Sequence, residues 1–323
     1  MALQKMNFES RTVSINEIDT QDSRYQLSLH IDTHTIIESI KAVGLINPPV
    51  IVKRDDDHYS IVCGFRRVMA CKALGWDEIP VCIPPRRPTD LDCLKLAILD
   101  NRSHRPLNLI EQSRAIKKLS PFFPPQERFS KITFLLGLPE NEKVFKKIES
   151  LCQLSESAKL GILENTLSLE AGVELVELEP EEQDCFAFLF RTLKFSQNKQ
   201  KELITFVKEI AIRESVGIKE VINSEEIRGI IDRSDINRNQ KAKEIRAYLR
   251  RRRFPSLTKA EAKFFEDLKS LRLGPHIRLV PPPYFEGTTY NITITFKDIT
   301  ELEQCKSEFD AMCQNPVLKR ILS

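Results

Sequence analysis

One stretch decides the fold of the N-terminal part of the chain: residues 61–81, with the sequence IVCGFRRVMACKALGWDEIPV. The apolar, largely β-branched residues before Gly64 predict a strand, and the residues after it predict a helix. That helix is expected to end at Gly75, because glycine suits the left-handed position that closes a helix. Residues 79–83 then predict the next buried strand. The order strand, turn, helix, strand indicates an α/β domain.

Two arginines, Arg66 and Arg67, open the predicted helix. A helix N-terminus favours an anion, because its first N–H groups lack intrahelical partners and the positive end of the helix dipole lies there. Guanidinium groups add fixed donors that bind phosphate in pairs. The arrangement therefore predicts a phosphate site. The alternative is that these arginines, with Arg105, only pair with carboxylates on the surface (Asp77, Glu78 and Asp100).

Two further segments accompany this turn. Residues 39–52, SIKAVGLINPPVIV, combine a helix end, a Gly-Leu turn and prolines that lead into a strand, and residues 100–111 are DNRSHRPLNLIE. Together with residues 64–70, they resemble in order and spacing the three conserved boxes of ParB-type partition proteins. The resemblance covers residues 10–118 and implies a ParB/sulfiredoxin-like α/β domain.

In that family the domain binds CTP with Mg²⁺ and uses the nucleotide to close a clamp on DNA, so the resemblance implies the same cofactors here. It assigns the metal ion to Asp100 and Asn101. The residue chemistry agrees, because a triphosphate needs several cationic or N–H donors and a hard cation held by oxygen ligands. The nucleotide-binding residues that the resemblance implies are Gly44, Asn47, Pro48, Gly64, Arg66, Arg67 and Arg105.

The chain departs from the family pattern within these boxes. Phe65 and Asp100 stand where the family has glutamate, Met69 where it often has arginine, and His104 where it has arginine, with Arg105 next to it. The shorter Asp100 still offers a carboxylate to a metal ion. Phe65 removes a carboxylate altogether, so we expect nucleotide binding with slow hydrolysis or none. Catalytic residues stay unassigned, and a weak CTPase activity is left open.

Cysteine placement argues against redox chemistry. Cys63 precedes Gly64, whereas the sulfiredoxin branch of this fold carries its redox cysteine after the glycine, so we interpret Cys63 as a small buried hydrophobic residue. The eight cysteines form no C-x-x-C pair, which indicates a reducing compartment without a disulfide or zinc framework. No segment reads as a signal peptide or membrane span. We expect a cytoplasmic protein without a membrane partner, and the resemblance adds association with the nucleoid.

Residues 119–215 predict an all-helical domain after a hinge at residues 121–125, where prolines break the preceding helix. Residues 127–138 predict a helix and residues 141–151 the next one. Two helices joined by a short glycine-containing turn have the shape of a DNA-reading helix-turn-helix, and the family carries such a motif in the same place. The side chains expected to face DNA are Asn141, Lys143, Lys146 and Lys147, with plain solvation of that helix as the alternative.

The small net charge of +3 hides an uneven distribution, because residues 238–253 hold eight cationic side chains against one acidic side chain. These residues predict a helix, and a surface of that kind attracts phosphate backbones without sequence preference. The expected DNA contacts are Arg250, Arg251, Arg252 and Arg253. A solvated linker helix is the alternative. Ile245, Tyr248 and Leu249 share one face, which indicates that the helix docks against something.

The last segment, residues 257–323, predicts a small α+β unit. Its first helix is expected to start with Thr258 as N-cap and Glu261 in the capping-box position. Two strands, at residues 277–280 and 290–296, and a helix over residues 299–312 follow.

One face of this unit is apolar. Ile292, Ile294 and Phe296 alternate along the second predicted strand, and so small a unit could hardly bury them alone. A dimerising module is one hypothesis, and packing on the chain's own basic helix is the other.

The sequence thus predicts an α+β multidomain chain. Residues 1–118 form the nucleotide-binding domain, 119–215 the helix-turn-helix domain, 216–256 a basic helical linker and 257–323 the α+β unit. The expected function is that of a homodimeric, CTP-gated clamp on DNA in chromosome or plasmid segregation, with a ParA-type ATPase as partner. Two alternatives stay open: a nucleotide-independent transcription regulator or adaptor that binds DNA, and a ParB-like enzyme, either a nuclease or a nucleotide hydrolase.

Overall fold

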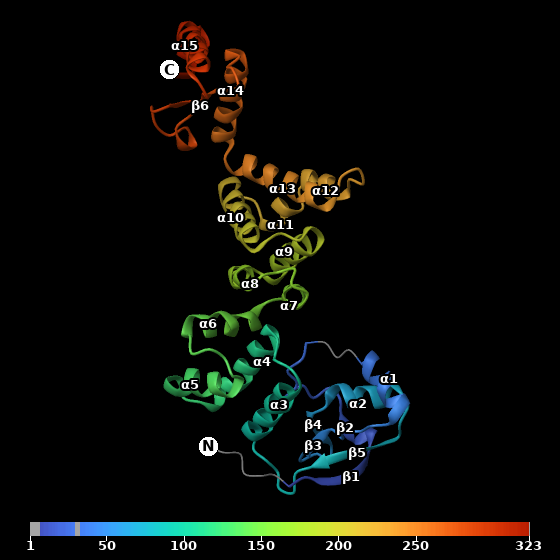
Figure 1. Ribbon diagram of the computed structural model, residues 1–323. Helices are drawn as coiled ribbons and strands as arrows, with labels where there is room; N and C mark the ends of the chain where they lie inside the picture. Colours follow the sequence, from blue (N-terminus) through green and yellow to red (C-terminus); the bar gives the residue numbers. More distant parts are fainter. Residues whose placement is uncertain (1–6, 30–32, 323) are drawn as a thin grey trace. The chain divides into compact units, whose positions relative to one another are not determined.

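The computed structural model describes residues 7–29 and 33–322. The chain divides into two compact units, Met1–Ile204 and Thr205–Ser323. The division falls within helix α10 (Gln197–Glu214). In the first unit strands and helices alternate as far as β5 and only helices follow, whereas the second unit is helical apart from one hairpin (Figure 1).

The first unit begins with a five-stranded sheet of order β1-β5-β3-β4-β2. Pairing is antiparallel between β1 and β5 and between β3 and β4, and parallel between β3 and β5 and between β2 and β4. Parallel neighbours require crossover connections, which helices supply. The strands are β1 (Glu9–Ser14), β2 (Ile18–Asp19), β3 (Val50–Lys53), β4 (Tyr59–Cys63) and β5 (Glu78–Ile83).

Helices cover both faces of this sheet. Successive residues of a strand point to opposite faces, so Ile51 and Ile61 pack in one core cluster while Val52 and Val62 pack in the other. The first cluster is covered by α1 (His34–Val43) and α2 (Phe65–Ala73). The second is covered by α3 (Asp90–His104) and α4 (Leu109–Leu119). The predicted α/β domain is confirmed.

The turn between β4 and α2 lies where the sequence predicts it. Gly64 adopts the left-handed conformation, with φ of 90°, and Gly75 closes α2 with φ of 73°. Only glycine takes such angles without strain. Cys63 ends β4 with 2% of its surface exposed, which confirms the prediction of a buried residue. None of the eight cysteines, all within the described residues, forms a disulfide.

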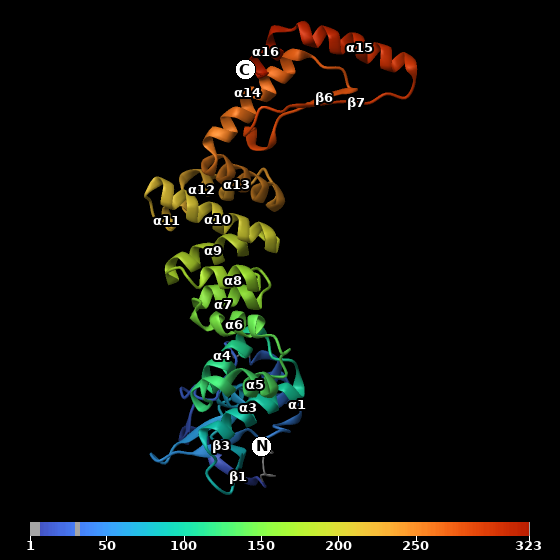
Figure 2. The same cartoon turned by 90° about the vertical axis from the view of Figure 1, so that its left-hand side faces the viewer.

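The rest of the first unit is helical, as Figure 2 shows for α6 to α9, which follow one another as a stack. The predicted helix, glycine turn and helix are present, because Gly137 closes α5 in the left-handed conformation and Asn141 caps α6. The helices are α5 (Pro125–Leu136), α6 (Glu142–Ser150), α7 (Glu156–Leu163), α8 (Leu169–Leu175) and α9 (Pro180–Leu193), with single turns at Ser120–Phe122 and Leu151–Gln153.

The proline segment breaks the helix but not the core. Helix α4 ends at Leu119 and α5 begins at Pro125. Side chains from both sides of the break, among them Leu119 and Ile132, nevertheless belong to the core cluster that also holds Val62 of the sheet. The predicted domain limits therefore stay predictions.

Two buried glutamines stabilise the stacked helices through side-chain hydrogen bonds to backbone groups. Gln183 accepts a hydrogen bond from the Ser155 amide, at the start of α7, and donates to the Leu178 carbonyl. Gln200, only 3% exposed, accepts from the amide of Ser168, the N-cap of α8, and donates to the carbonyls of Thr166 and Phe195. Each amide side chain satisfies backbone groups that water does not reach.

Gln200→Leu is expected to lower the free energy of unfolding by about 1–2 kcal/mol, because it leaves buried backbone groups without partners. Chemical denaturation measures the loss. Lys199→Gln, at an exposed position one residue earlier, is the control and is expected to change little. Equal stability of the Gln200→Leu and control proteins would contradict the assignment.

The second unit contains helices and one hairpin. Its strands β6 (Ile277–Val280) and β7 (Asn291–Ile294) pair antiparallel, as predicted. The basic segment is the single helix α13 (Arg238–Arg253), as predicted. The other elements are α11 (Ile218–Ile222), α12 (Glu225–Asp232), α14 (Pro255–Leu271), a turn at Pro283–Phe285, α15 (Ile299–Gln314) and α16 (Pro316–Leu322).

The predicted start of α14 is wrong. The helix begins at Pro255, which suits a first helical position, and Thr258 lies inside the helix rather than at its N-cap. Its hydroxyl is buried without a hydrogen-bond partner. Glu261 therefore closes no capping box.

The apolar face of the C-terminal hairpin is buried on β6 and partly exposed on β7, where Ile292 lies directly opposite Leu279. Leu279 of β6 packs with Phe264, Met312 and Leu318 in a small core. On β7, however, Ile292 is 40% exposed, and Phe296, two residues beyond the strand, is 51% exposed. Both hypotheses for this face stay predictions.

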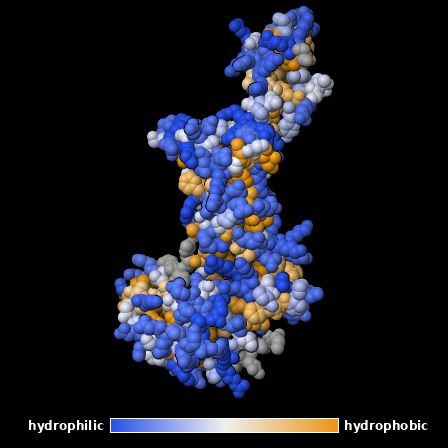
Figure 3. All heavy atoms as spheres, turned by 180° about the vertical axis from the view of Figure 1, so that it is seen from behind, coloured by the Kyte–Doolittle hydropathy of each residue, from blue (hydrophilic) through white to orange (hydrophobic). Residues whose placement is uncertain are grey.

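Among the described residues, no helix is long and apolar enough to cross a membrane. Hydrophilic residues make up most of the face seen in Figure 3, and hydrophobic residues appear between them.

Candidate functional site

A pocket of about 460 Å³ opens beside the turn between β4 and α2. Residues from distant parts of the sequence meet there: the end of α1, the β4–α2 turn, the end of α3 and residues 25–28. Of the residues predicted to bind nucleotide and metal, the pocket brings together Gly44, Asn47, Gly64, Arg66, Arg67, Arg105, Asp100 and Asn101. Pro48 does not line the pocket.

The N-terminus of α2 lies at this pocket, because Gly64, Arg66 and Arg67 all line it. Gly64 is the N-cap, and its carbonyl accepts from the amides of Arg67 and Val68. A Cβ atom at Gly64 would lie 2.9 Å from Cβ of Pro49 and 3.0 Å from Nε of Arg67. Glycine is therefore required here both by its backbone angle and by the close approach of its neighbours. No acidic side chain of α2 occupies its first turn, which favours an anion there, although the Asp100 carboxylate lies 3.7 Å from Nη2 of Arg67.

Arg67 connects the three predicted boxes. Its Nη1 donates to the carbonyl of Asn47 at 2.7 Å and lies 3.5 Å from that of Pro48, and its Nη2 lies 3.7 Å from the Asp100 carboxylate. Pro48 thus contributes a backbone oxygen to Arg67 rather than a pocket wall. The predicted alternative, an ion pair between these arginines and Asp100, is present for Arg67.

Asp100 and Asn101 lie side by side near the end of α3. The Asp100 carboxylate is shared between Arg67 and His104, whose Nε2 lies 3.8 Å away. The Asn101 amide nitrogen donates to the Ala97 carbonyl at 2.7 Å, which leaves its oxygen as an acceptor. Among the described residues, no group of three His, Cys, Asp or Glu side chains could hold a metal ion. Mg²⁺ is commonly held by one or two protein oxygens plus phosphate oxygens, and these two side chains fit that pattern.

Arg105 is held by a buried carboxylate. Its guanidinium donates two hydrogen bonds to Glu111, at 2.7 and 2.6 Å, and Glu111 is only 2% exposed. Glu111 also accepts from the hydroxyl of Ser28 and the amide of Asn108, the N-cap of α4. Burial opposes ionisation of Glu111, but these hydrogen bonds outweigh it and hold its pKa below the usual value. Arg105 therefore lies fixed at the rim of the pocket.

Apolar side chains complete the wall. Phe65, half-buried at the start of α2, and Leu45 line the pocket and also pack on the core cluster under α1 and α2. Burial and the nearby Asp100 carboxylate raise the pKa of the Cys63 thiol above its usual range, so it stays protonated at neutral pH. The cavity thus joins a cationic rim to a partly apolar interior.

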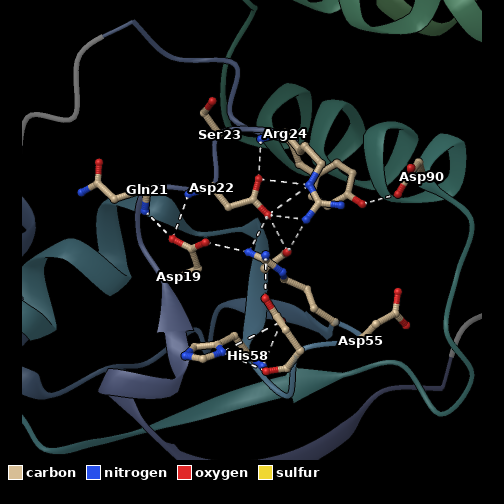
Figure 4. A network of polar contacts seen from close by, with 12 residues as sticks. Asp19, Gln21, Asp22, Ser23, Arg24, Asp55, His58 and Asp90 are labelled. Atoms are coloured by element: carbon tan, nitrogen blue, oxygen red, sulfur yellow. Dashed lines mark hydrogen bonds and ion pairs between the residues drawn. The ribbon is translucent and has the colours of Figure 1, made fainter.

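A network of charged side chains fixes the loop that forms one wall of the pocket (Figure 4). Asp19 accepts from Arg54 at 2.6 Å, and Asp22 accepts from the Ser60 hydroxyl at 2.6 Å and from Arg24 at 2.9 Å. Burial opposes ionisation of Asp22, but hydrogen bonds from Arg24 and Ser60 lower its pKa. The loop after β2 is thereby held against β4, which places residues 25–28 beside the pocket.

Comparison with known proteins identifies this domain. Residues 2–102 match the family model of the ParB N-terminal domain. This part of the chain belongs to that family. The predicted family and its mixed α/β fold are confirmed for the ParB N-terminal domain, and the remainder of the chain is mostly helical.

Curated relatives extend beyond the ParB N-terminal domain. The nucleoid occlusion proteins of Bacillus thuringiensis (strain Al Hakam) and Bacillus anthracis are 27% identical to this chain over 168 residues. The match covers 51% of this chain and 56% of each relative. This chain thus spans little more than half the length of the curated relatives it matches.

Solved structures of ParB from Caulobacter crescentus also align. The C-terminally truncated protein complexed with CTP-γ-S is 20% identical, with a TM-score of 0.27 over 56% of this chain and 98% of that one. The form complexed to the centromeric parS site is 18% identical, with a TM-score of 0.35 over 60% and 97%. Similarity at this level assigns no ligand to the present chain.

The side chains predicted to face DNA from α6 are only partly free to do so. The Asn141 side-chain oxygen accepts from the amides of Lys143 and Val144, so it caps the helix. Lys146 pairs with Glu142 at 2.8 Å, and Lys147 lies 3.8 Å from Glu170. Lys143 is exposed. Surface pairs of this kind are weak enough for a phosphate to replace.

The arginines predicted to bind DNA from α13 are largely committed within the second unit. Arg250 pairs with Glu261 at 2.8 Å and Arg252 with Glu214 at 2.6 Å, and Arg253 pairs with Glu209. Arg251 is exposed. Ile245 and Leu249 are fully buried, which confirms that the helix docks. The charge of α13 therefore serves in large part to join it to α10 and α14.

The sequence analysis missed two parts of the site. Residues 25–28 form a pocket wall without any motif that would reveal them. Glu111 is the other: it belongs to the third box, but the spacing Asn108-x-x-Glu111 is also that of a capping box, which predicts both side chains at the start of a helix.

Proposed function

We propose that this chain is a ParB-type DNA-binding protein whose N-terminal domain binds CTP and couples that binding to retention on DNA. The observation that carries the proposal is the pocket beside the β4–α2 turn, where residues of all three predicted boxes converge. Its rim is cationic and its interior is partly apolar, which suits a triphosphate and a base respectively.

Phosphates fit best at the N-terminus of α2. Gly64 and Arg66 line the pocket at this N-terminus. Arg67 and Arg105 line it as well, and their guanidinium groups are held by Asn47 and Glu111 respectively. Fixed donors of this kind bind a phosphate without reorganisation. Mg²⁺, when bound with the nucleotide, would neutralise phosphate charge beside Asp100 and Asn101. Arg67 already holds the loop of Asn47 and Pro48, so phosphate binding would act directly on the position of that loop.

The test is calorimetric titration of the full chain with CTP, ATP and GTP in the presence of Mg²⁺. Selective binding of CTP supports the proposal. If no nucleotide binds, the clamp is refuted and a nucleotide-independent DNA-binding adaptor takes its place.

Turnover of the bound nucleotide is expected to be slow. Phe65 lines the pocket at the first position of α2, where the family pattern has a glutamate. Phe65→Glu is expected to raise the rate of CTP hydrolysis, because it restores a carboxylate able to orient a water molecule. Phosphate release measures the rate, and Phe65→Leu serves as the control. An equal rate in both variants would exclude this role for the position.

DNA binding is proposed for α5 and α6, with α6 as the reading helix. Lys143→Gln/Lys146→Gln is expected to reduce the slope of log affinity against log salt concentration by about 2, because each lysine that neutralises a phosphate releases about one counterion. Fluorescence anisotropy on duplex DNA measures the slope. Lys41→Gln/Lys199→Gln removes the same charge from exposed positions elsewhere and is expected to leave the slope unchanged.

The proposal includes a homodimer, a ParA-type ATPase as partner and a role in chromosome or plasmid segregation. The exposed apolar side chains of β7 support a self-contact through the C-terminal unit, because isolated apolar faces of this kind are commonly covered. Sedimentation equilibrium of the full chain tests the dimer.

A further inference from the structure

A second pocket, of about 570 Å³, lies in the first unit between α4, α7 and the loop of residues 23–29. Its cationic lining residues are Arg114, Lys117, Lys118 and Lys159. Among the described residues that line it there is no carboxylate. This pocket is separate from the one beside α2, although Gln26 lines both.

The cations converge from two helices. Arg114, Lys117 and Lys118 are three and four residues apart on α4, so they share one face of that helix. Lys159 comes from α7, about forty residues further along the chain. Like charges at such spacing repel one another, and a face of this kind is favourable only where an anion or a set of acceptors lies opposite.

Two of these cationic side chains, Arg114 and Lys118, already donate hydrogen bonds to the neighbouring loop. Arg114 donates to the Ser28 carbonyl at 2.8 Å, and Lys118 donates to the carbonyls of Ser23 and Arg24, each at 2.8 Å. These neutral acceptors hold the loop but cancel no charge. Burial, reinforced by the charge of Arg114, lowers the pKa of Lys118. Lys159 pairs with Glu156 at 2.9 Å while its own side chain is only 12% exposed.

We propose that this pocket binds a phosphate group. Arg114 and Lys118 each have donors beyond those used on the loop, and Lys117 of α4 and Lys159 of α7 also line the cavity. The hydroxyl of Ser23 and the amide of Gln26 add neutral polar groups to the same wall. A phosphate oxyanion matches this set, because it accepts several hydrogen bonds and neutralises more than one cation. The phosphate belongs either to a free polyphosphate or to the backbone of DNA.

Cys152 provides a local readout, because this half-buried free thiol lines the pocket. Its alkylation by N-ethylmaleimide is followed in the full chain by peptide mass spectrometry. Tripolyphosphate at ten times its dissociation constant is expected to slow the reaction about tenfold. The exposed Cys313 is the internal reference and is expected to react at an unchanged rate.

Lys117→Gln/Lys159→Gln removes two of the cations and spares Arg114 and Lys118, which hold the loop. In this variant the tripolyphosphate concentration needed for protection is expected to rise about tenfold. Lys41→Gln/Lys199→Gln is the matched control and keeps full protection. Protection is also expected to persist in Arg67→Ala, which alters the pocket beside α2, so the two sites are tested separately.

Protection by a short DNA duplex but not by tripolyphosphate, lost in Lys117→Gln/Lys159→Gln, would support the site with the DNA backbone as the source of the phosphate. Protection by tripolyphosphate would support it with a free polyphosphate. Three results would overturn the proposal: protection by neither probe, equal protection of the double variant, or protection that disappears in Arg67→Ala.

Discussion

Arg67→Ala is expected to weaken CTP binding about 100-fold, because a charge-assisted contact to phosphate contributes about 1.5–3 kcal/mol and the same side chain positions the neighbouring loop. Arg67 donates to the carbonyl of Asn47 and lies beside that of Pro48, and it also faces Asp100. Removal would therefore take away a phosphate ligand and leave the Asp100 carboxylate without one of its cations. Isothermal titration with CTP and Mg²⁺ measures the loss.

Two further variants separate binding from folding. Arg67→Lys keeps the charge but not the paired donors, so it is expected to recover part of the affinity. Arg86→Ala removes an exposed arginine that does not line the pocket beside the β4–α2 turn. This variant is expected to bind CTP as the unaltered protein does. Affinity of Arg67→Ala within about twofold of that control would mean that Arg67 only holds the loop. Circular dichroism establishes that each variant is folded.

Local signals in the sequence predicted most of the secondary structure. The turn at Gly64, the closure of α2 at Gly75 and the helix over residues 238–253 all depend on residues a few positions apart. Thr258 shows the limit of such signals, since its capping-box spacing is present while Pro255, three residues earlier, starts the helix instead. A single earlier residue with a strong preference overrides the later motif.

The candidate site depended on more than local spacing. Motifs predicted the cationic residues Arg66, Arg67 and Arg105, and the fold brings them to one pocket. No motif predicted residues 25–28, because the loop that carries them is held by contacts with distant residues, Arg54 to Asp19 and Ser60 to Asp22. The second pocket was not predicted either, because Lys159 lies beside the cationic residues of α4 only after folding. The pairing of α13 arginines with glutamates likewise required the packing of three helices.

Glu111→Gln is expected to lower the free energy of unfolding by about 2–3 kcal/mol at pH 7, because it removes the charge that Arg105 pairs with in a buried position. The expected loss of unfolding free energy is smaller than that for a fully buried ion pair, because the Arg105 side chain is about half exposed. Glu111 also caps α4 and accepts from Ser28, so the substitution is expected to loosen the connection between the pocket and α4. Urea denaturation measures the change, with the exposed Glu38→Gln as the control.

The pH dependence of that loss distinguishes charge from packing. The pKa of Glu111 in the folded chain lies below its ordinary value of 4.5, so the carboxylate stabilises the folded state fully above that value. The stabilisation is lost as the pH falls from 4.5 through the folded-state pKa, where the unaltered protein protonates Glu111 as well. The difference in unfolding free energy between the unaltered protein and Glu111→Gln is therefore expected to be constant at neutral pH and to shrink as the pH falls below 4.5. If the difference in unfolding free energy does not shrink below pH 4.5, Glu111 acts by shape and hydrogen bonding rather than by charge. Arg105 at the rim of the pocket would then be held by something other than its charge.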